Sequence, residues 1–384
     1  MESTIQTIPT QKPKYTFIDL FAGCGGLSLG LEKSGFSPIF VNEIVPQYLE
    51  TYRRNHNLPE QSYYLGDIAD LNKEIEKFLI IFEEVDLVCG GPPCQGFSMA
   101  NRQRIIDDPR NKLYKEFLLF LSKVQPKFFI MENVKGLKNK WHEIEEDIKK
   151  YLPGYNFDSS VLYAEDYGVP QHRERFILIG NRVGVDTKLI FDAIYEQKRK
   201  PFTLGDALAY LPKLGNKDGK GRGSVENNIS GYTECPYEYT KNDFYYFING
   251  SKDIQMLYNH KNRYNNERDI EIFRRLPQGA NSLHESISDI MPYTKRKNIF
   301  KDKFFKLRDN EICKTITAHM QFDCNMYIHP WEPRGLSPRE AARIQTFPDD
   351  YVIYGPQNKW YAQVGNAVPV KLAEVIGNAI KRFL

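Results

Sequence analysis

Cysteine is scarce in this chain of 384 residues. The six that occur are Cys24, Cys89, Cys94, Cys235, Cys313 and Cys324. They are too few for a disulfide scaffold of this length, so the sequence predicts a reduced, cytoplasmic protein. No run of about 18 apolar residues occurs, which predicts no membrane span. The polar start MESTIQTIPTQKPKY lacks the apolar core that secretory signals carry.

An excess of basic charge is also lacking. Lys and Arg number 52 against 49 Asp and Glu, giving a net charge of +3. This balance excludes a histone-like protein but not a nucleic-acid-binding one, because clustering matters more than the sum. One segment, Tyr293–Arg308, interleaves Lys and Arg with Phe and Tyr and has Asp302 as its only acid. We expect it to be either a solvated surface or a face that follows phosphates.

The chain does contain a regular alternation of short apolar runs and helical stretches, from about residue 15 to residue 182. Such alternation is typical of parallel βαβ units and predicts an α/β fold with a doubly wound sheet. After residue 183 the alternation ends, and polar connections rich in glycine and asparagine replace it. The stretch LSPREAARIQTF is expected to form a helix that begins with Ser337 as N-cap and Pro338 at its first position.

A glycine-rich turn, FAGCGGLSLG, lies between the first apolar run and the helix after it. This context suits a nucleotide-binding loop, although the spacing from Gly23 to Gly25 and Gly26 is not the full dinucleotide pattern. Glu43 and Asp67 end the next two apolar runs. Each could be an ordinary turn residue or helix cap. Together, at the carboxyl edge of one sheet, they favour a ligand carrying a ribose.

A single thiol stands in a constrained stretch, GGPPCQGFS, directly after another apolar run. Cys94 could be a nucleophile, a metal ligand, half of a disulfide or a small buried residue. We expect no metal, because no second Cys/His pair stands nearby, and disulfide is the weakest explanation. Glu132, Arg173 and Arg175 lie at the ends of neighbouring predicted strands. A thiol, an acid and paired guanidinium groups favour covalent catalysis over a buried structural cysteine.

The order of motifs resembles one family closely. FIDLFAGCGG, VNE, GDI, GGPPCQGFS, MENV, PQHRERF, LSPREAARIQTFP and QVGNAVP follow one another from Tyr15 to the end of the chain. They resemble the DNA (cytosine-5)-methyltransferases of bacterial restriction-modification type, which use S-adenosyl-L-methionine. The resemblance implies a Rossmann-like methyltransferase domain over residues 1–183 and a smaller target-recognition domain over 184–353. It also implies that residues 354–384 return to the catalytic domain.

The resemblance implies roles for the site residues. The Cys94 thiolate adds to cytosine C6, Glu132 hydrogen-bonds the ring N3 and the exocyclic amine, and Arg173 and Arg175 hold O2 and the adduct. The sequence does not divide the work between the two arginines. The cofactor contacts are expected from Phe21, Gly23, Gly25, Glu43, Asp67 and Asn366.

The resemblance also implies that the target cytosine is flipped out of double-stranded DNA. The stretch Gln95–Lys112 matches a mobile loop that closes on DNA. Expected DNA contacts are Gln95, Ser98 and Arg110 in that loop and Thr315 and Thr317 in KTITAHM. Arg339, Arg343 and Gln345 are expected to organise the domain junction rather than to touch bases.

Three other functions compete with this hypothesis. A transfer-RNA methyltransferase is disfavoured because its Cys-Phe-Thr motif is missing, and a non-catalytic homologue because Cys94 and Glu132 are both present. A nicotinamide-dependent oxidoreductase is disfavoured by the glycine spacing. We expect a monomer on DNA, with a cognate restriction endonuclease acting separately.

Overall fold

The computed structural model describes residues 14–82, 84–93, 113–215, 231–238, 240–291 and 303–384. Cys94, Gln95, Ser98 and Arg110, and most of the basic segment that contains Asp302, lie outside these residues. No helix among the described residues is long and apolar enough to cross a membrane.

Seven strands of the described chain form one sheet, in the order β3-β2-β1-β4-β5-β7-β6. Their bounds are β1 Thr16–Leu20, β2 Ser37–Glu43, β3 Tyr63–Leu65, β4 Leu87–Gly90, β5 Phe128–Asn133, β6 Asn156–Tyr163 and β7 Glu174–Asn181. The first five are parallel, which confirms the doubly wound α/β fold. β7 instead runs antiparallel to both β5 and β6. The short β6–β7 connection permits this, since antiparallel neighbours need no crossover helix.

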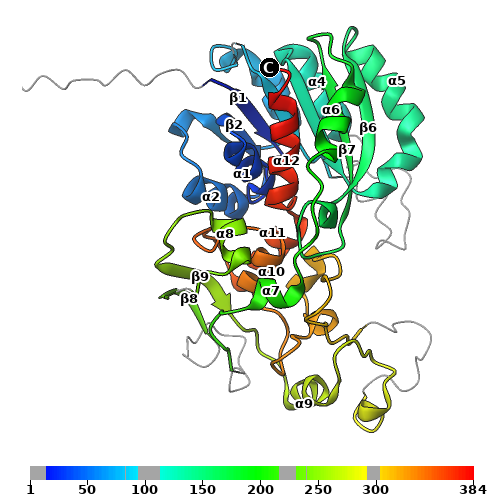
Figure 1. The fold of residues 1–384 in the computed structure, drawn as a ribbon. Coiled ribbons are helices and arrows are strands. Elements are labelled where there is room, and N and C mark those ends of the chain that lie inside the picture. The colour runs from blue at the N-terminus through cyan, green and yellow to red at the C-terminus, as the bar shows by residue number, and fades with distance from the viewer. Residues whose placement is uncertain (1–13, 83, 94–112, 216–230, 239, 292–302) are drawn as a thin grey trace, which may run out of the picture.

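Helices cover both faces of this sheet (Figure 1). One face carries α1 (Gly26–Lys33), α6 (Thr187–Tyr195) and α12 (Val370–Lys381), and the other carries α3 (Ile68–Glu74), α4 (Leu113–Val124) and α5 (Trp141–Tyr151). Successive strand residues point to opposite faces. Accordingly Phe17 and Leu87 pack in the first layer, while Ile18 and Val88 pack in the second. The helix α2 (Pro46–Asn55) packs beside β2 and β3.

The last helix lies against the first (Figure 1). A Cβ at Gly30 of α1 would stand 2.3 Å from the Cβ of Ala373 in α12, so only glycine allows this approach. Gly377 of α12 likewise faces Ser34, with 2.2 Å between its ideal Cβ and the Ser34 Oγ. The end of the chain is therefore built into the layer that begins with α1. The predicted boundaries at residues 183 and 353 remain a prediction.

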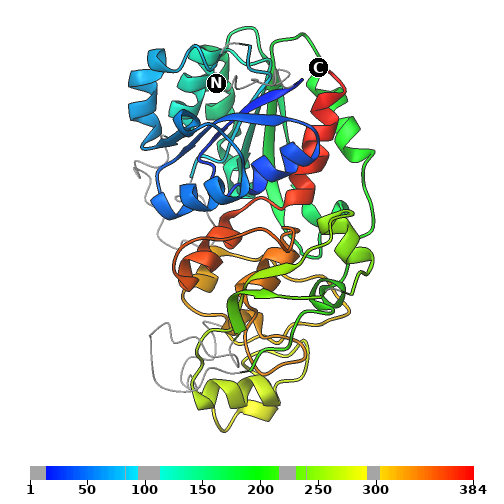
Figure 2. The ribbon, with the colours of Figure 1, turned by 90° about the vertical axis from the view of Figure 1, so that its left-hand side faces the viewer.

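A second lobe lies below the sheet in Figures 1 and 2. It contains α7 (Leu204–Leu208), β8 (Gly231–Pro236), α8 (Asp243–Asn249), β9 (Met256–Lys261), α9 (Glu267–Arg275), α10 (Pro338–Ile344) and α11 (Gln357–Asn366). β8 and β9 form an antiparallel pair. The α10 helix begins as the sequence predicts, because Ser337 and Glu340 form a reciprocal capping box and Pro338 stands at the start.

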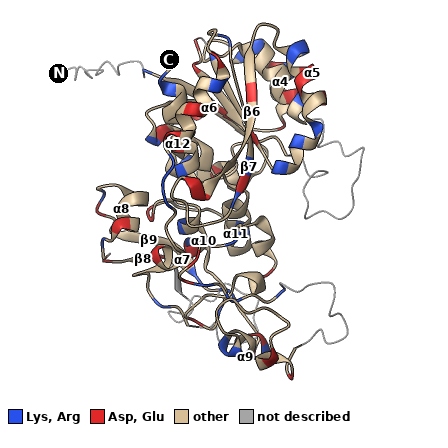
Figure 3. Cartoon of the chain, turned by 45° about the vertical axis from the view of Figure 1, so that its right-hand side comes forward, with Lys and Arg blue, Asp and Glu red and all other residues tan. Residues whose placement is uncertain are grey.

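The described end of the basic segment, residues 303–308, is partly interior. Phe304 and Leu307 are buried, and the Lys306 Nζ donates to the carbonyl of Phe273. Basic and acidic residues also lie together along α9 (Figure 3), and Arg275 pairs with Glu271 of the same helix and with Asp289 further along the chain. Of residues 303–308, Phe304 and Leu307 are thus interior, while Arg308 is exposed and pairs with Glu311. The phosphate-following face stays a prediction.

Candidate active site

A pocket of about 680 Å³ opens at the carboxyl ends of the parallel strands. Its walls come from segments that are far apart in the sequence. They include Asp19 of β1 and the glycine turn after it, Glu43 at the end of β2, Asp67 before α3, Glu132 and Arg175 on β5 and β7, and residues 365–368 at the end of α11 and just beyond it. The topology explains this convergence, because ligands of such sheets bind where the strands end.

The glycine turn has an unusual backbone. Phe21, Gly23 and Gly25 have φ values of 57°, 59° and 80°. A phenylalanine in this left-handed region is strained by about 1–2 kcal/mol, and such strain is typical of functional turns. Phe21 and Gly23 line the pocket. Gly25 is needed for packing, because its Cβ would lie 2.4 Å from the Nε2 of His56 and 2.8 Å from the Tyr351 hydroxyl.

Two acids, Glu43 and Asp67, line the pocket beside the glycine turn. The Glu43 carboxylate accepts from the backbone N–H of Gly23 at 2.7 Å, Ile44 at 2.9 Å and Val45 at 2.8 Å. Burial raises its pKa, and these donors oppose the rise. Asp67 accepts from the N–H of Ala69 at 2.8 Å and so caps α3 while it lines the pocket. Both carboxylates are held in place and keep further lone pairs for a ligand's donors.

Asp19 is a pocket residue that the sequence analysis missed. It lies in β1, is 1% exposed, and accepts from the Ser28 hydroxyl at 2.6 Å. Burial raises its pKa to about 7. The available signal was an acid inside the otherwise apolar run YTFIDLF, since a buried acid needs a partner or a function.

The opposite wall holds Glu132 and Arg175 on neighbouring antiparallel strands. The Arg175 Nε lies 2.6 Å from the Glu132 Oε1, and each side chain is 12% exposed. Burial lowers the pKa of Arg175, and Glu132 opposes this change. The next residue, Asn133, donates to the carbonyl of Pro92 at 2.8 Å. It therefore fixes the turn that leads toward position 94.

Arg173 is held away from the pocket. It is fully buried, and its guanidinium donates to the carbonyls of Ile316 at 2.6 Å, Gly365 at 3.0 Å and Ala367 at 2.7 Å. Burial, followed by the nearby charge of Arg175, lowers its pKa well below the ordinary value. The two arginines that the sequence could not tell apart thus have different surroundings.

Gln171 and Gln345 add hydrogen bonds beside those of Arg173, between the strand side of the sheet and the segment around residue 345. The Gln171 Nε2 donates to the Gln345 Oε1 at 2.6 Å, and its Oε1 accepts from the N–H of Ile316. The Gln345 Nε2 donates to the carbonyls of Val364 and Ala367. Arg339 is fully buried and donates to the carbonyls of Tyr258, Pro348 and Tyr351, all within the second lobe, so its role at the domain junction stays a prediction.

Asn366 is exposed at the end of α11 and lines the pocket. The two threonines of KTITAHM make contacts within the chain. The Thr315 hydroxyl donates to the carbonyl of His172 at 2.5 Å, and the Thr317 Oγ1 lies 3.2 Å from the Tyr327 hydroxyl. Their oxygens can still accept hydrogen bonds from another molecule.

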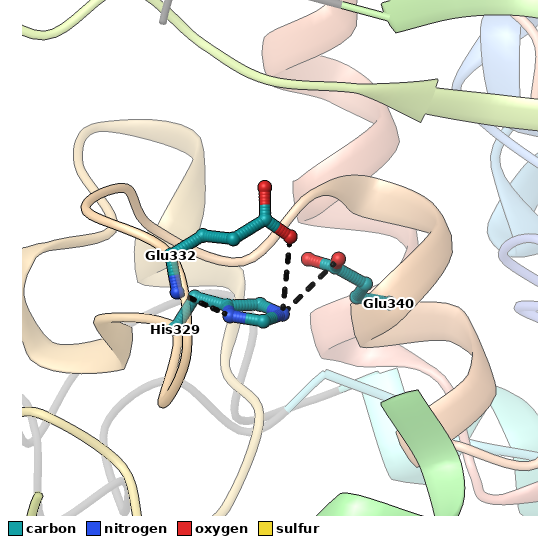
Figure 4. A group of neighbouring side chains, drawn as sticks. All are labelled: His329, Glu332 and Glu340. Carbon is teal, nitrogen blue, oxygen red and sulfur yellow. Dashed lines mark hydrogen bonds and ion pairs between the residues drawn. The ribbon is translucent and has the colours of Figure 1, made fainter. Parts of the chain in front are cut away.

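His329, Glu332 and Glu340 gather as metal ligands would (Figure 4). However, the His329 Nδ1 accepts from the backbone N–H of Trp331 and Glu332, each at 3.1 Å, so the ring proton lies on Nε2 toward the glutamates. Arg334 donates to both glutamates and supplies the positive charge. Burial lowers the pKa of His329 to about 3, so the ring is neutral. The donor set therefore fits a buried polar network rather than a cation site.

Comparison with known proteins places the chain in a family. The family described as C-5 cytosine-specific DNA methylase matches residues 15–382. The chain belongs to this family. The resemblance drawn from the motifs is thereby confirmed, and the protein is a DNA (cytosine-5-)-methyltransferase.

Relatives and solved structures agree with this assignment. The methyltransferase is 33% identical to the Type II methyltransferase M1.HphI of Haemophilus parahaemolyticus, over 96% of this chain and 87% of the relative. It is 31% identical to M.DdeI of Desulfomicrobium norvegicum, over 95% and 88%. A structure described as a prophage-encoded DNA modification methyltransferase (E. coli) shares 27% identity and a TM-score of 0.71, with 96% of this chain and 99% of that one covered. The S. pombe Dnmt2 structure, 16% identical with a TM-score of 0.56, shares the fold.

Proposed function

We propose that the chain transfers a methyl group from S-adenosyl-L-methionine to C5 of a cytosine flipped out of a specific sequence in double-stranded DNA. The observation that carries the proposal is the single pocket that joins the glycine turn and Glu43 to the Glu132–Arg175 pair. One end suits a nucleoside and the other suits a base. A methyl donor bound at the first end and a cytosine bound at the second end would bring the methyl group and C5 together inside the pocket.

The residues at the first end fit the cofactor by type. Glu43 accepts hydrogen bonds from the ribose hydroxyls, and Asp67 accepts one from the adenine amine. Phe21 stacks on the adenine ring. Gly23 lines the methionine side, with Gly25 shaping the turn, and Asn366 contacts the methionine portion. When bound, S-adenosyl-L-methionine supplies an electrophilic methyl group. The protein's own contribution here is to hold and orient it.

At the second end, the chemistry begins with the thiolate of Cys94. Its addition to C6 forms the S–C6 bond and breaks the aromaticity, so that electron density builds at C5. Glu132 hydrogen-bonds N3 and the exocyclic amine, and Arg175 holds Glu132 and the O2 atom. After methylation, loss of the C5 proton and cleavage of the S–C6 bond release Cys94. Arg173 acts indirectly in this scheme, because its three bonds to backbone carbonyls shape the wall behind Arg175.

The relatives named above are Type II methyltransferases, which supports a role in protecting host DNA beside a separate restriction endonuclease. Gln95, Ser98 and Arg110, with Thr315 and Thr317, are proposed to contact the DNA, and the protein is proposed to act as a monomer. Flipping costs a few kcal/mol of base stacking, which these contacts must offset.

The decisive experiment supplies radiolabelled S-adenosyl-L-methionine with plasmid DNA or transfer RNA. We expect label on DNA alone, no label with Cys94→Ala, and normal labelling with Cys235→Ala, a half-buried cysteine of the second lobe. Label on transfer RNA would support the competing hypothesis. Normal turnover by Cys94→Ala would overturn the proposed nucleophile, and no label on DNA would overturn the function.

A further inference from the structure

The methionine end of the proposed cofactor carries a carboxylate, and the charges of the pocket do not favour it. Among the described residues that line the pocket, four are acids, namely Asp19, Glu43, Asp67 and Glu132. Arg175 is the only Lys, Arg or His of this described lining, and it is paired with Glu132. The carboxylate must therefore be held by neutral donors.

Apart from Arg175, most side-chain donors of the described lining already bond to carbonyls of the chain. Two do not. The Tyr48 hydroxyl and the Asn366 amide have no hydrogen bond to any residue that the structure describes. Asn366 is already an expected contact of the methionine portion, whereas no role has been given to Tyr48. The bonded donors are the amides of Asn42, Asn133 and Gln363, on the carbonyls of Gly66, Pro92 and Tyr354, and the Cys24 thiol, on the carbonyl of Gln363.

Tyr48 reaches the pocket from the first turn of α2. This helix begins where the Glu43 carboxylate accepts from the N–H groups of the next two residues, so Tyr48 and Glu43 are held close together. Tyr52 lies one turn further along the same face of the helix. It is fully buried, and its hydroxyl lies 2.8 Å from that of Ser28. Tyr48, at the pocket end of this face, is only half-buried and keeps its hydroxyl available.

The phenol of Tyr48 is suited to donate a hydrogen bond. Burial raises its pKa, and the neighbouring Cys24 and Glu43 raise it further, so the phenol keeps its proton near neutrality. Tyr48 thus stands near both the carboxylate proposed to take the ribose and the glycine turn proposed to hold the methionine. The methionine carboxylate is the only anionic group of the cofactor, and an ionised acceptor forms the stronger hydrogen bond.

We propose that the Tyr48 hydroxyl, together with the Asn366 amide, donates a hydrogen bond to the methionine carboxylate of the bound cofactor. The inference rests on the proposed cofactor site. A neutral phenol suits this position because the same cofactor carries a positive sulfonium and a positive ammonium group. A lysine there would attract the carboxylate but repel both of those groups.

Tyr48→Phe tests the proposal, because it removes the donor and keeps the ring that packs on α2. Binding is measured by calorimetry with two ligands. The first is S-adenosylhomocysteine, the product form of the cofactor, and the second is its decarboxylated analogue, which keeps the adenine, the ribose and the ammonium group. We expect Tyr48→Phe to weaken binding of S-adenosylhomocysteine by about tenfold or more, as for a lost hydrogen bond to a charged group. Affinity for the analogue should stay unchanged, which would also show that the variant is folded.

Tyr246→Phe is the matched control. Tyr246 is an exposed tyrosine of α8 outside the pocket lining, so loss of its hydroxyl should change neither affinity. Equal losses with both ligands in Tyr48→Phe would overturn the proposal, because the hydroxyl would then contact another part of the cofactor. Unchanged binding of both ligands would overturn it as well. Failure of the wild type to bind either ligand would instead overturn the proposed cofactor site.

Discussion

Arg175 and Glu132 are paired across two antiparallel strands, with 2.6 Å between Nε and Oε1. The pair forms a wall of the same pocket that Glu43 lines. Since both side chains are largely buried, the loss of either leaves the other as an uncompensated charge. The pair therefore links the stability of this wall to the chemistry proposed for it.

Glu132→Gln should reduce methyl transfer by about 10²-fold or more, because the amide cannot take part in proton transfer at N3. Binding of S-adenosylhomocysteine should change little. Turnover is measured with labelled cofactor and saturating DNA. Glu174→Gln is the matched control, since Glu174 is the neighbouring acid on β7 and pairs with Lys135 outside the pocket lining. Equal turnover by the two variants would contradict the role of Glu132.

Arg173→Ala should lower the free energy of unfolding by about 3 kcal/mol or more, because three buried carbonyls lose their donor. Arg175→Lys should lower it less and should mainly reduce turnover, since a lysine keeps the charge but not the planar contact. Urea unfolding followed by circular dichroism measures the first effect, and labelling measures the second. Similar stability losses in both variants would argue against separate roles for the arginines.

Glu43→Gln should weaken binding of S-adenosylhomocysteine by about tenfold, because a carboxylate accepts from ligand hydroxyls more strongly than an amide does. Calorimetry of the protein without DNA measures this change. Glu60→Gln serves as control, since Glu60 is exposed and pairs with Arg53 at the surface. Retained affinity in Glu43→Gln would indicate that the ribose lies elsewhere.

Asp19 should make the unfolding free energy depend on pH. Its folded-state pKa of about 7 lies above the ordinary value of 3.8, so the folded protein holds this proton more tightly. The resulting stability is complete below about pH 4 and is lost as the pH rises toward about 7, by on the order of 4 kcal/mol. Asp19→Asn should flatten the curve over this range. Urea unfolding at each pH tests this, and an unchanged slope would show that Asp19 is not the group responsible.

The sheet and most of the pocket could be predicted from the sequence because strand ends are easy to locate. Glu43 and Glu132 each follow a short apolar run, and the carboxyl ends of parallel strands meet at one edge. The reversed direction of β7 could not be predicted, since a buried run looks alike in either direction. Arg173 and Arg175 could not be separated, because the burial of Arg173 depends on carbonyls of Ile316, Gly365 and Ala367, far along the chain.

Gln363 and residues 365–368 line one wall of the pocket, and α12 follows them to lie against α1. During synthesis on the ribosome, the glycine turn and Glu43 emerge first, but the pocket is not enclosed until this late wall has been translated and has docked. A nascent chain would thus have little affinity for its methyl donor. Competence for methylation should therefore arrive in one step, once this wall has docked.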